Sequence, residues 1–325
     1  MYYRSISDLN KIILNKLHIL PKDFDLIVGV PRSGMLPANL LALYLNKPYT
    51  DLHSFINGHI YKAGARGQFF DIKSFKKILV VDDSVGSGGA INEVKEKLSQ
   101  VNGEFIYSYC AIYMAPGKEK LVNYYFETIP FPRYFQWNVM NHTSLTKACF
   151  DIDGVLCVDP TEEENDDGEK YREFLLNAKP LFIPGCKIGA LVTSRLEKYR
   201  KETELWLAKN NVKYDELIML DLPNKEARQK LNNHSTHKAN TYQKNNYTLF
   251  IESSLHQAKE INRITGKPVL CTENFEMIFE NESIAYNIKS GKYFPFLKNL
   301  ALKIRNKFRE IKSNRKLVIQ TSNHL

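Results

Sequence analysis

Residues 76–100 read KKILVVDDSVGSGGAINEVKEKLSQ, and this stretch decides the fold of the first part of the chain. Its apolar run is typical of a buried strand and ends in Asp82 and Asp83. A short loop of small residues follows, and then the apolar spacing of an amphipathic helix. Strand, loop and helix units of this kind build parallel sheets, whose ligands bind beyond the carboxyl ends of the strands. The stretch therefore predicts an α/β fold with a site at residues 82–90.

The same alternation of strands and helices recurs along most of the chain. DLIVGV is followed at once by the helical pattern GMLPANLLALYL, and a second series begins with KACFDID and continues through IGALVT, ELIML, YTLFI and PVLC. At 325 residues, with 43% hydrophobic and 25% charged residues, the composition indicates a globular protein with room for two domains. We predict two doubly wound domains with mostly parallel sheets, at residues 1–146 and 147–288, and a basic segment at 289–325.

The loop after the first acidic pair suits a phosphorylated sugar. Backbone N–H groups at the start of a helix face an anion, and glycines allow it to approach closely. Ser87 can add a hydroxyl donor, and the two aspartates can accept hydrogen bonds from ribose hydroxyls. The residues expected to bind are Asp82, Asp83, Gly86, Ser87, Gly88, Gly89 and Ala90.

This pattern resembles the fingerprint of the type I phosphoribosyltransferases, in which two acids precede a loop ending in Thr-Gly-x-Thr. Ser87 and Ala90 stand at the two threonine positions, so one hydroxyl contact to the 5-phosphate is missing. Gly86 stands where purine-using members carry an Asp, which argues against a purine acceptor. The resemblance implies phosphoribosyl diphosphate as the donor, with Mg²⁺.

Two further stretches resemble parts of the same family. GVPRSGMLPA is similar to its diphosphate loop, whose residues here are Pro31, Arg32, Ser33 and Gly34. The Gly-rich basic stretch with Lys62 and Arg66 is placed like the loop that closes over the donor, although a solvated basic loop explains it equally well.

The second series of strands begins with DIDGV, which resembles the first motif of the haloacid dehalogenase (HAD) superfamily of phosphatases. That resemblance implies Asp151 as the nucleophile and Asp153 as the general acid and base, and it extends to phosphate binding by Thr193 and Ser194. Mg²⁺ is expected between Asp151, the backbone carbonyl of Asp153 and Glu252.

Lys238 is the better candidate for the charge-neutralising lysine of that superfamily, with Lys244 as a competitor. Only a minimal cap is expected, because about forty residues separate the first and second motifs. An open site of this kind suits a phosphate carried on a bulky molecule.

The basic segment contains ten Lys or Arg residues between Lys289 and Lys316, against the single acid Glu310. Its apolar residues recur every three or four positions, as on one face of a helix. Peripheral contact with the inner face of a membrane and docking on protein are equally consistent with this pattern, and nucleic acid is not expected. The five scattered cysteines and the absence of a long apolar run favour a reducing cytoplasm.

Both motifs together resemble the dual-domain ribofuranosyltransferases of bacterial surface polysaccharides. That resemblance implies transfer of 5-phosphoribose to a glycan, expected to be lipid-linked, with inversion, followed by removal of the 5-phosphate. The alternative is a nucleotide-salvage or donor-sensing protein fused to a nucleotidase-type phosphatase. A membrane-associated scaffold with two vestigial sites is a third interpretation.

Overall fold

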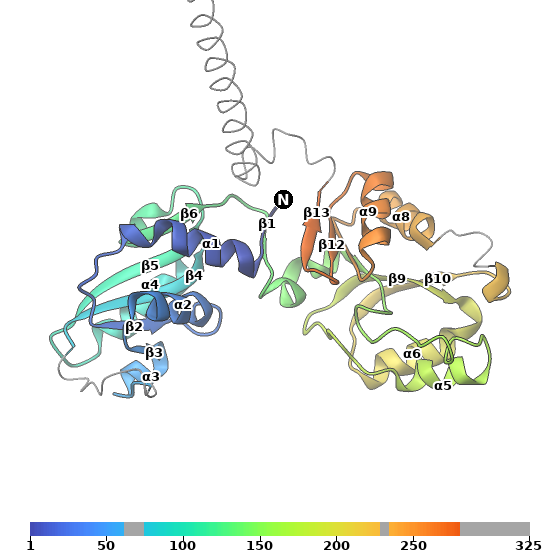
Figure 1. The fold of residues 1–325 in the computed structure, drawn as a ribbon, viewed down its shortest axis with the longest axis horizontal. Helices are drawn as coiled ribbons and strands as arrows, with labels where there is room; N and C mark the ends of the chain where they lie inside the picture. Colours follow the sequence, from blue (N-terminus) through green and yellow to red (C-terminus); the bar gives the residue numbers. More distant parts are fainter. Residues whose placement is uncertain (62–74, 228–233, 280–325) are drawn as a thin grey trace, which may run out of the picture.

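The computed structural model describes residues 1–61, 75–227 and 234–279. Figure 1 shows two lobes side by side, each built on its own sheet with helices on both faces. The fold is α/β with mostly parallel sheets, as the alternation of strands and helices predicted.

The sheet of the N-terminal lobe has five strands in the order β3-β2-β4-β5-β6, and every neighbouring pair is parallel. Parallel neighbours need crossover connections, which the helices of this lobe supply. The strands are β2 (Leu26–Gly29), β3 (Tyr49–Asp51), β4 (Lys77–Val85), β5 (Ile106–Met114) and β6 (Tyr124–Thr128). The helices are α1 (Ile6–Lys16), α2 (Met35–Leu45), α3 (Leu52–Ile56) and α4 (Gly89–Ser99).

Alternate residues of β2 and β4 belong to two separate cores on opposite faces of the sheet. Leu79 and Val81 of β4 pack with α1 and α2 on one face of the sheet. Ile78 and Val80 pack with α3 and α4 on the other. Because successive side chains of a strand point to opposite faces, a continuous apolar run is what a strand buried on both sides requires.

The sheet of the C-terminal lobe has six strands in the order β10-β9-β8-β11-β12-β13. The last strand pairs antiparallel with its neighbour, and the other pairs are parallel. The strands are β8 (Ala148–Phe150), β9 (Ile188–Leu196), β10 (Tyr214–Leu220), β11 (Leu249–Glu252), β12 (Val269–Cys271) and β13 (Glu276–Ile278). The helices are α5 (Glu169–Asn177), α6 (Arg200–Lys209), α8 (His234–Lys244) and α9 (Leu255–Thr265).

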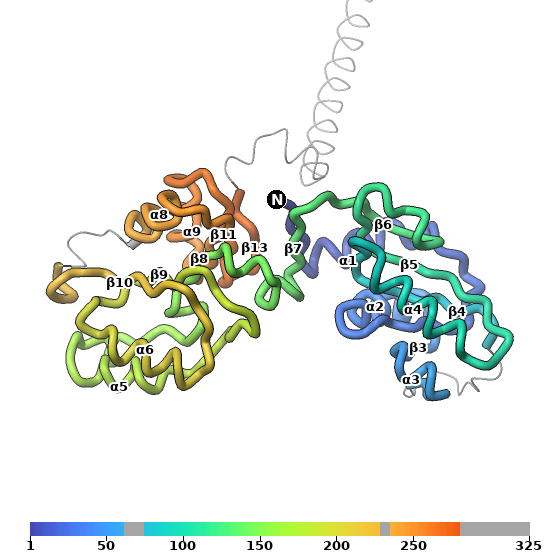
Figure 2. Tube along the Cα trace, turned by 180° about the vertical axis from the view of Figure 1, so that it is seen from behind, coloured from blue at the N-terminus to red at the C-terminus, as the bar shows by residue number. Residues whose placement is uncertain are grey.

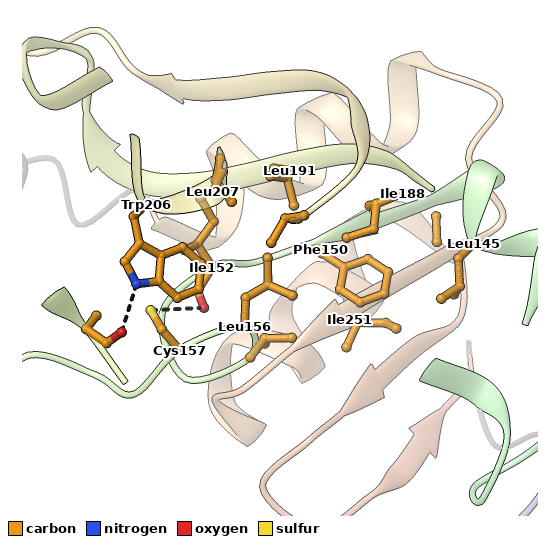
Figure 3. Close-up of a cluster of buried hydrophobic side chains, with 14 of the residues drawn as sticks. Leu145, Phe150, Ile152, Leu156, Cys157, Ile188, Leu191, Trp206, Leu207 and Ile251 are labelled. Atoms are coloured by element: carbon orange, nitrogen blue, oxygen red, sulfur yellow. Dashed lines mark hydrogen bonds between the residues drawn. The ribbon is translucent and has the colours of Figure 1, made fainter. Parts of the chain in front are cut away.

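Two cores again flank this sheet. Figure 3 shows the larger one, where Trp206 and Leu207 of α6 pack toward Phe150 and Leu191 of the strands. The indole Nε1 of Trp206 donates to the carbonyl of Ala178 at 2.8 Å, so its only polar group is satisfied. On the opposite face, α8 and α9 cover the sheet.

A short two-stranded sheet joins the lobes. In it, β1 (Tyr2–Arg4) pairs in parallel with β7 (Arg133–Phe135), and Figures 1 and 2 both place these strands between the lobes. Tyr3 belongs to the core of the C-terminal lobe, and its hydroxyl donates to the carbonyl of Phe275 at 2.7 Å. The N-terminal strand therefore stabilises the lobe that lies farther along the chain.

Some elements differ from the sequence-based expectation. Taken alone, the sequence SRLEKYRKETELWLAKN at 194–210 has the pattern of a helix, but residues 194–196 continue β9, and α6 begins only at Arg200. The reason is non-local, because Leu196 pairs with Leu220 of β10. Strands β3, β6 and β13 and the β1–β7 pair were not predicted either. No helix in the described ranges combines the length and apolarity that a membrane crossing requires.

Candidate functional site

Asp82 and Asp83 lie near the carboxyl end of the central strand β4, where a ligand site was expected. Both are buried, and the backbone N–H of Asp83 donates to Oδ1 of Asp82 at 2.8 Å. Burial and then the charge of Asp83 raise the pKa of Asp82 to about 8. Burial also raises the pKa of Asp83, although the hydrogen bond from Trp137 opposes this shift. The pair therefore holds a proton more tightly than exposed aspartates do.

The glycine loop leads from β4 into α4 as predicted. β4 continues to Val85, and α4 begins at Gly89 after Gly88, which has a φ of 101° that favours glycine. No side chain caps the start of this helix, and Ser87 Oγ accepts only a long hydrogen bond of 3.4 Å from the Gly89 N–H. The first turn of α4 thus presents backbone donors of the kind that bind anions.

The loop of residues 31–34 lies beside this site because β2 and β4 are parallel neighbours. Gly34 packs so tightly that an added Cβ would lie 2.7 Å from the carbonyl oxygen of Val30 and 2.8 Å from that of Val81. Ser33 Oγ accepts a hydrogen bond of 2.8 Å from Asn138. Arg32, joined to Pro31 by a cis peptide bond, is exposed. The structure therefore brings the two predicted loops of the N-terminal lobe together.

Trp137 is a residue of this site that sequence reasoning missed. Its indole Nε1 donates to Oδ2 of Asp83 at 2.6 Å, and its ring stacks on Phe135, with the ring centroids 5.0 Å apart. The signal was the aromatic stretch FPRYFQWN, whose periodicity is too weak to identify an element. Arg133 in the same stretch also lies against the loop, with Nη2 3.3 Å from an ideal Cβ position at Gly86.

The C-terminal lobe gathers a second set of charged groups at the carboxyl ends of β8 and β11. These strands are parallel neighbours, which places Asp151, just after β8, beside Glu252 at the end of β11. Lys238 of α8 donates to Asp151 Oδ2 at 2.6 Å and to Glu252 Oε2 at 2.7 Å. All three are buried, and Lys238 is 1% exposed. Lys244 is exposed, so the structure brings Lys238 rather than its competitor to the carboxylates.

Burial and mutual charge shift the pKa values of this cluster. Burial raises the pKa of Asp151 to about 7, opposed by Lys238 and reinforced by Glu252. Burial alone would lower the pKa of Lys238, but Asp151 and Glu252 outweigh it and the pKa is raised. Gln257 of α9 adds a further acceptor, 2.9 Å from the ammonium, which the sequence did not single out. The lysine is therefore held as a cation by three acceptors.

Asp153 lies next to this cluster, and its carboxylate pairs with an arginine to which the sequence assigned no role. Arg195 donates from Nη2 to Asp153 Oδ1 at 2.6 Å and from Nε to Oδ2 at 3.1 Å. The arginine is fully buried, and its Nη1 also donates to Thr203 at 3.3 Å. The sequence placed Arg195 directly after Ser194 but gave it no role. This bidentate contact fixes the position of the Asp153 carboxylate.

The expected phosphate-binding hydroxyls lie on β9. Thr193 was expected at the end of its strand, but it is an interior residue of β9 and is fully buried. Its Oγ1 accepts a hydrogen bond of 3.2 Å from the Arg195 N–H. Ser194 is half-buried at the next position. The strand continues past both residues because it pairs with β10 as far as Leu196.

The expected metal ligands provide oxygens only. Within residues 1–61, 75–227 and 234–279, no three side chains of His, Cys, Asp and Glu form a metal-binding group. Asp151 and Glu252 supply two carboxylates, and the Asp153 carbonyl, which accepts from Ser253 Oγ at 3.2 Å, is the third expected donor. Carboxylate and carbonyl oxygens are the donors that Mg²⁺ takes, so the set fits this ion chemically.

Several sequence-based predictions lie outside the described residues. These are the closing-loop candidates Lys62 and Arg66 and the basic amphipathic segment at 289–325. Membrane contact through that segment stays a prediction.

Comparison with known proteins bears on the N-terminal lobe. Residues 2–140 match the model of the phosphoribosyl transferase domain. The chain is 31% identical over 94 residues to the transcriptional regulator GfcR of Methanococcoides burtonii, a match that covers 28% of this chain and 45% of that protein. It is 26% identical over 128 residues to the orotate phosphoribosyltransferase of Sulfurisphaera tokodaii, covering 38% of this chain and 60% of the relative. The chain thus spans about half the length of these curated relatives.

Among solved structures, a purine phosphoribosyltransferase from Pyrococcus horikoshii is 21% identical, with a TM-score of 0.30, and the match covers 42% of this chain and 92% of that one. A xanthine-guanine-hypoxanthine phosphoribosyltransferase from Helicobacter pylori is 18% identical, with a TM-score of 0.33 and the same coverage. From the domain match and the strand, loop and helix arrangement at Asp82 and Asp83, we conclude that the N-terminal region of this chain is a phosphoribosyltransferase domain of type I.

Proposed function

We propose that this chain transfers the 5-phosphoribosyl group of phosphoribosyl diphosphate to a glycan acceptor and then hydrolyses the 5-phosphate. The N-terminal lobe would carry out the transfer and the C-terminal lobe, as a HAD-type phosphatase, the hydrolysis. One observation carries the proposal. Lys238 contacts both Asp151 and Glu252, and this cluster lies on the same chain as a phosphoribosyltransferase domain.

In the transfer step, the backbone N–H groups at the start of α4 would bind the 5-phosphate, and Asp82 and Asp83 the ribose hydroxyls. The loop of residues 31–34 would hold the diphosphate. Mg²⁺, when bound with the donor, supplies charge neutralisation for the leaving diphosphate. The C1–O bond to the diphosphate breaks as an acceptor hydroxyl attacks the opposite face and loses its proton. Inversion at C1 follows from that geometry.

In the hydrolysis step, an oxygen of Asp151 would attack phosphorus while Asp153 donates a proton to the departing sugar oxygen. Asp153 would then take a proton from water as the water oxygen attacks phosphorus and releases Asp151. Lys238 would neutralise charge at Asp151, and Thr193 and Ser194 would bind phosphate oxygens. Arg195 would act as a positioning residue, because it contacts both oxygens of Asp153.

The decisive experiment is product analysis by mass spectrometry, with phosphoribosyl diphosphate, Mg²⁺ and a synthetic or lipid-linked glycan. We expect a ribosylated glycan from the unchanged chain and a phosphoribosylated glycan, heavier by one phosphate, from Asp151→Asn. Changing Asp82 and Asp83 to Asn should abolish both products. Identical products from the unchanged chain and Asp151→Asn would refute the phosphatase step.

A second candidate function is nucleotide salvage or donor sensing with a fused nucleotidase. The similarity to proteins named a transcriptional regulator and an orotate phosphoribosyltransferase favours it. Consumption of the donor with a nucleobase, or donor binding without turnover of any acceptor, would select this alternative. Because Gly86 stands where purine-using enzymes carry an Asp, a pyrimidine is the base to try first.

A further inference from the structure

Arg133 is a buried cation that lies beside the glycine loop. Neither the proposed transfer step nor the proposed hydrolysis step uses this arginine. It lies in β7 and is 7% exposed. Its Nη2 is 3.3 Å from the position that a Cβ would take at Gly86, the first residue of the loop. The guanidinium therefore lies directly against the loop that leads into α4.

The nearby protein groups leave this guanidinium incompletely satisfied. In the part of the chain that the structure describes, the buried Nη1 has no hydrogen-bond partner. Asp83 acts on Arg133 through its charge, but burial outweighs it and the pKa of Arg133 is lowered. A buried cation without a hydrogen-bonded anion reduces the stability of the fold.

Aromatic contacts do not replace the missing partner. The guanidinium carbon lies 4.8 Å from the ring centroid of Phe131 and 5.7 Å from that of Phe135. Such contacts use the flat face of the guanidinium, whereas its N–H donors lie in the plane, where Nη1 still lacks a partner among the described residues. Phe131 is itself 63% exposed and lies 3.4 Å from the same Cβ position at Gly86. The arginine and the ring together border one side of the loop.

We propose that Arg133, with Phe131 packed on it, forms an oxyanion subsite beside residues 86–90. The ligand is a carboxylate or phosphate group of a substrate bound at that loop. Arginine suits both groups because its fork of donors matches two oxygens at once. The inference rests on the proposed substrate site of the N-terminal lobe and requires no phosphatase activity.

The oxyanion has two possible sources, the donor phosphates or an acidic group on the acceptor. Isothermal titration of the 325-residue chain separates them. One arm uses phosphoribosyl diphosphate with Mg²⁺. The other compares matched anionic and neutral rings, orotate against uracil and glucuronate against glucose. Inorganic diphosphate serves as a further probe that needs no turnover.

Arg133→Met should weaken binding of the anionic probe from the correct source by about 10- to 100-fold, the loss expected for charge-assisted hydrogen bonds. Arg133→Lys keeps the charge but lacks the fork of donors, so its affinity should lie between those of the unchanged chain and Arg133→Met. Arg263, 70% exposed on α9, gives the matched control Arg263→Met, which should bind as the unchanged chain does. Because the buried Nη1 has no hydrogen bond to lose and its burial as a cation is unfavourable, the melting temperature of Arg133→Met should equal or exceed that of the unchanged chain, whereas loss of a purely structural arginine would lower it.

Each outcome either identifies the source of the oxyanion or overturns the subsite. A loss confined to phosphoribosyl diphosphate and inorganic diphosphate assigns the subsite to the donor, and a lost preference for the charged ring assigns it to the acceptor. Unchanged binding of every probe by a folded Arg133→Met or Arg133→Lys chain overturns the proposal. If the unchanged chain binds inorganic diphosphate through Arg133 but never consumes the donor, the transfer activity fails while the subsite stands. If the unchanged chain binds no anionic probe, the subsite fails.

Discussion

The N-terminal lobe buries an aspartate pair near the end of β4, and the C-terminal lobe buries one carboxylate just after β8 and one at the end of β11, but only the second pair contacts a lysine. Asp151 and Glu252 share Lys238, whereas the Asp82 and Asp83 carboxylates form no ion pair with a described lysine or arginine. Unpaired buried carboxylates bind protons more tightly, and paired ones depend on the continued presence of the cation. The two sites should therefore respond differently to mutation and to pH.

Replacing Lys238 by Met should destabilise the chain by about 3–5 kcal/mol, because the change leaves two buried carboxylates without their cation. Urea unfolding measures the loss. Lys244→Met is the matched control, since this lysine lies on the same helix and is exposed. Equal stability of the two variants would contradict the inference that Lys238 stabilises the chain through the two carboxylates.

The free energy of unfolding should fall as pH rises from about 4 to about 8 and should change little above that. Burial raises the pKa of Asp82 to about 8 in the folded chain, so the folded state holds a proton that the unfolded chain releases near pH 4. The stabilisation is complete below the unfolded pKa and disappears above the folded one. In Asp82→Asn, the free energy of unfolding should depend less on pH, and at pH 9 the variant should be more stable than the unchanged chain. Thermal unfolding at a series of pH values measures both effects. A slope that is unchanged in Asp82→Asn would mean that another group causes it.

At the scale of elements, parallel neighbours determine which loops meet. β2 and β4 pair in register, so the loops that follow them lie together, and β8 and β11 do the same in the other lobe. The approach is close at Gly34, where backbone atoms of β4 occupy the space that a side chain would need. That contact couples the shape of one loop to the strand that carries Asp82 and Asp83.

Gly34→Ala should therefore weaken donor binding and lower stability by about 1–3 kcal/mol, the usual cost of overpacking. The added methyl would lie 2.9 Å from the Asp82 Cα, so the loop must shift away from β4. Gly89→Ala is the control for stability, because its nearest neighbour would be 3.8 Å away and alanine favours helix α4. Equal melting temperatures for Gly34→Ala and the unchanged chain would show that the loop of residues 31–34 can shift without a loss of stability.

At the scale of the whole molecule, the chain crosses between its lobes more than once. β1 begins the sequence, pairs with β7 near the end of the phosphoribosyltransferase domain, and places Tyr3 in the core of the C-terminal lobe. Figure 1 labels β1 and Figure 2 labels β7 at the junction between the lobes. The stability of the second lobe therefore depends on the first residues of the chain.

Tyr3→Ala should destabilise the C-terminal lobe by about 3 kcal/mol, because it removes a buried ring and the hydrogen bond to Phe275. Chemical denaturation, followed by hydrogen exchange of the C-terminal strands, measures this effect. Tyr125→Ala, at a residue that is 39% exposed on β6, is the control. If exchange in the C-terminal strands were unaffected by Tyr3→Ala, the lobes would be energetically independent.

The sequence by itself determined the two series of strands and helices, because apolar runs and helical spacing are local properties of the chain. It also located the acids near the end of β4 and just after β8, because the apolar run stops at these acids, although β4 itself continues to Val85. Only the tertiary structure selected Lys238 over Lys244 and paired Arg195 with Asp153, Trp137 with Asp83 and Tyr3 with Phe275. These partners come from elements far apart in the chain. Which side chains meet depends on the order and register of the strands, and no local pattern encodes that order.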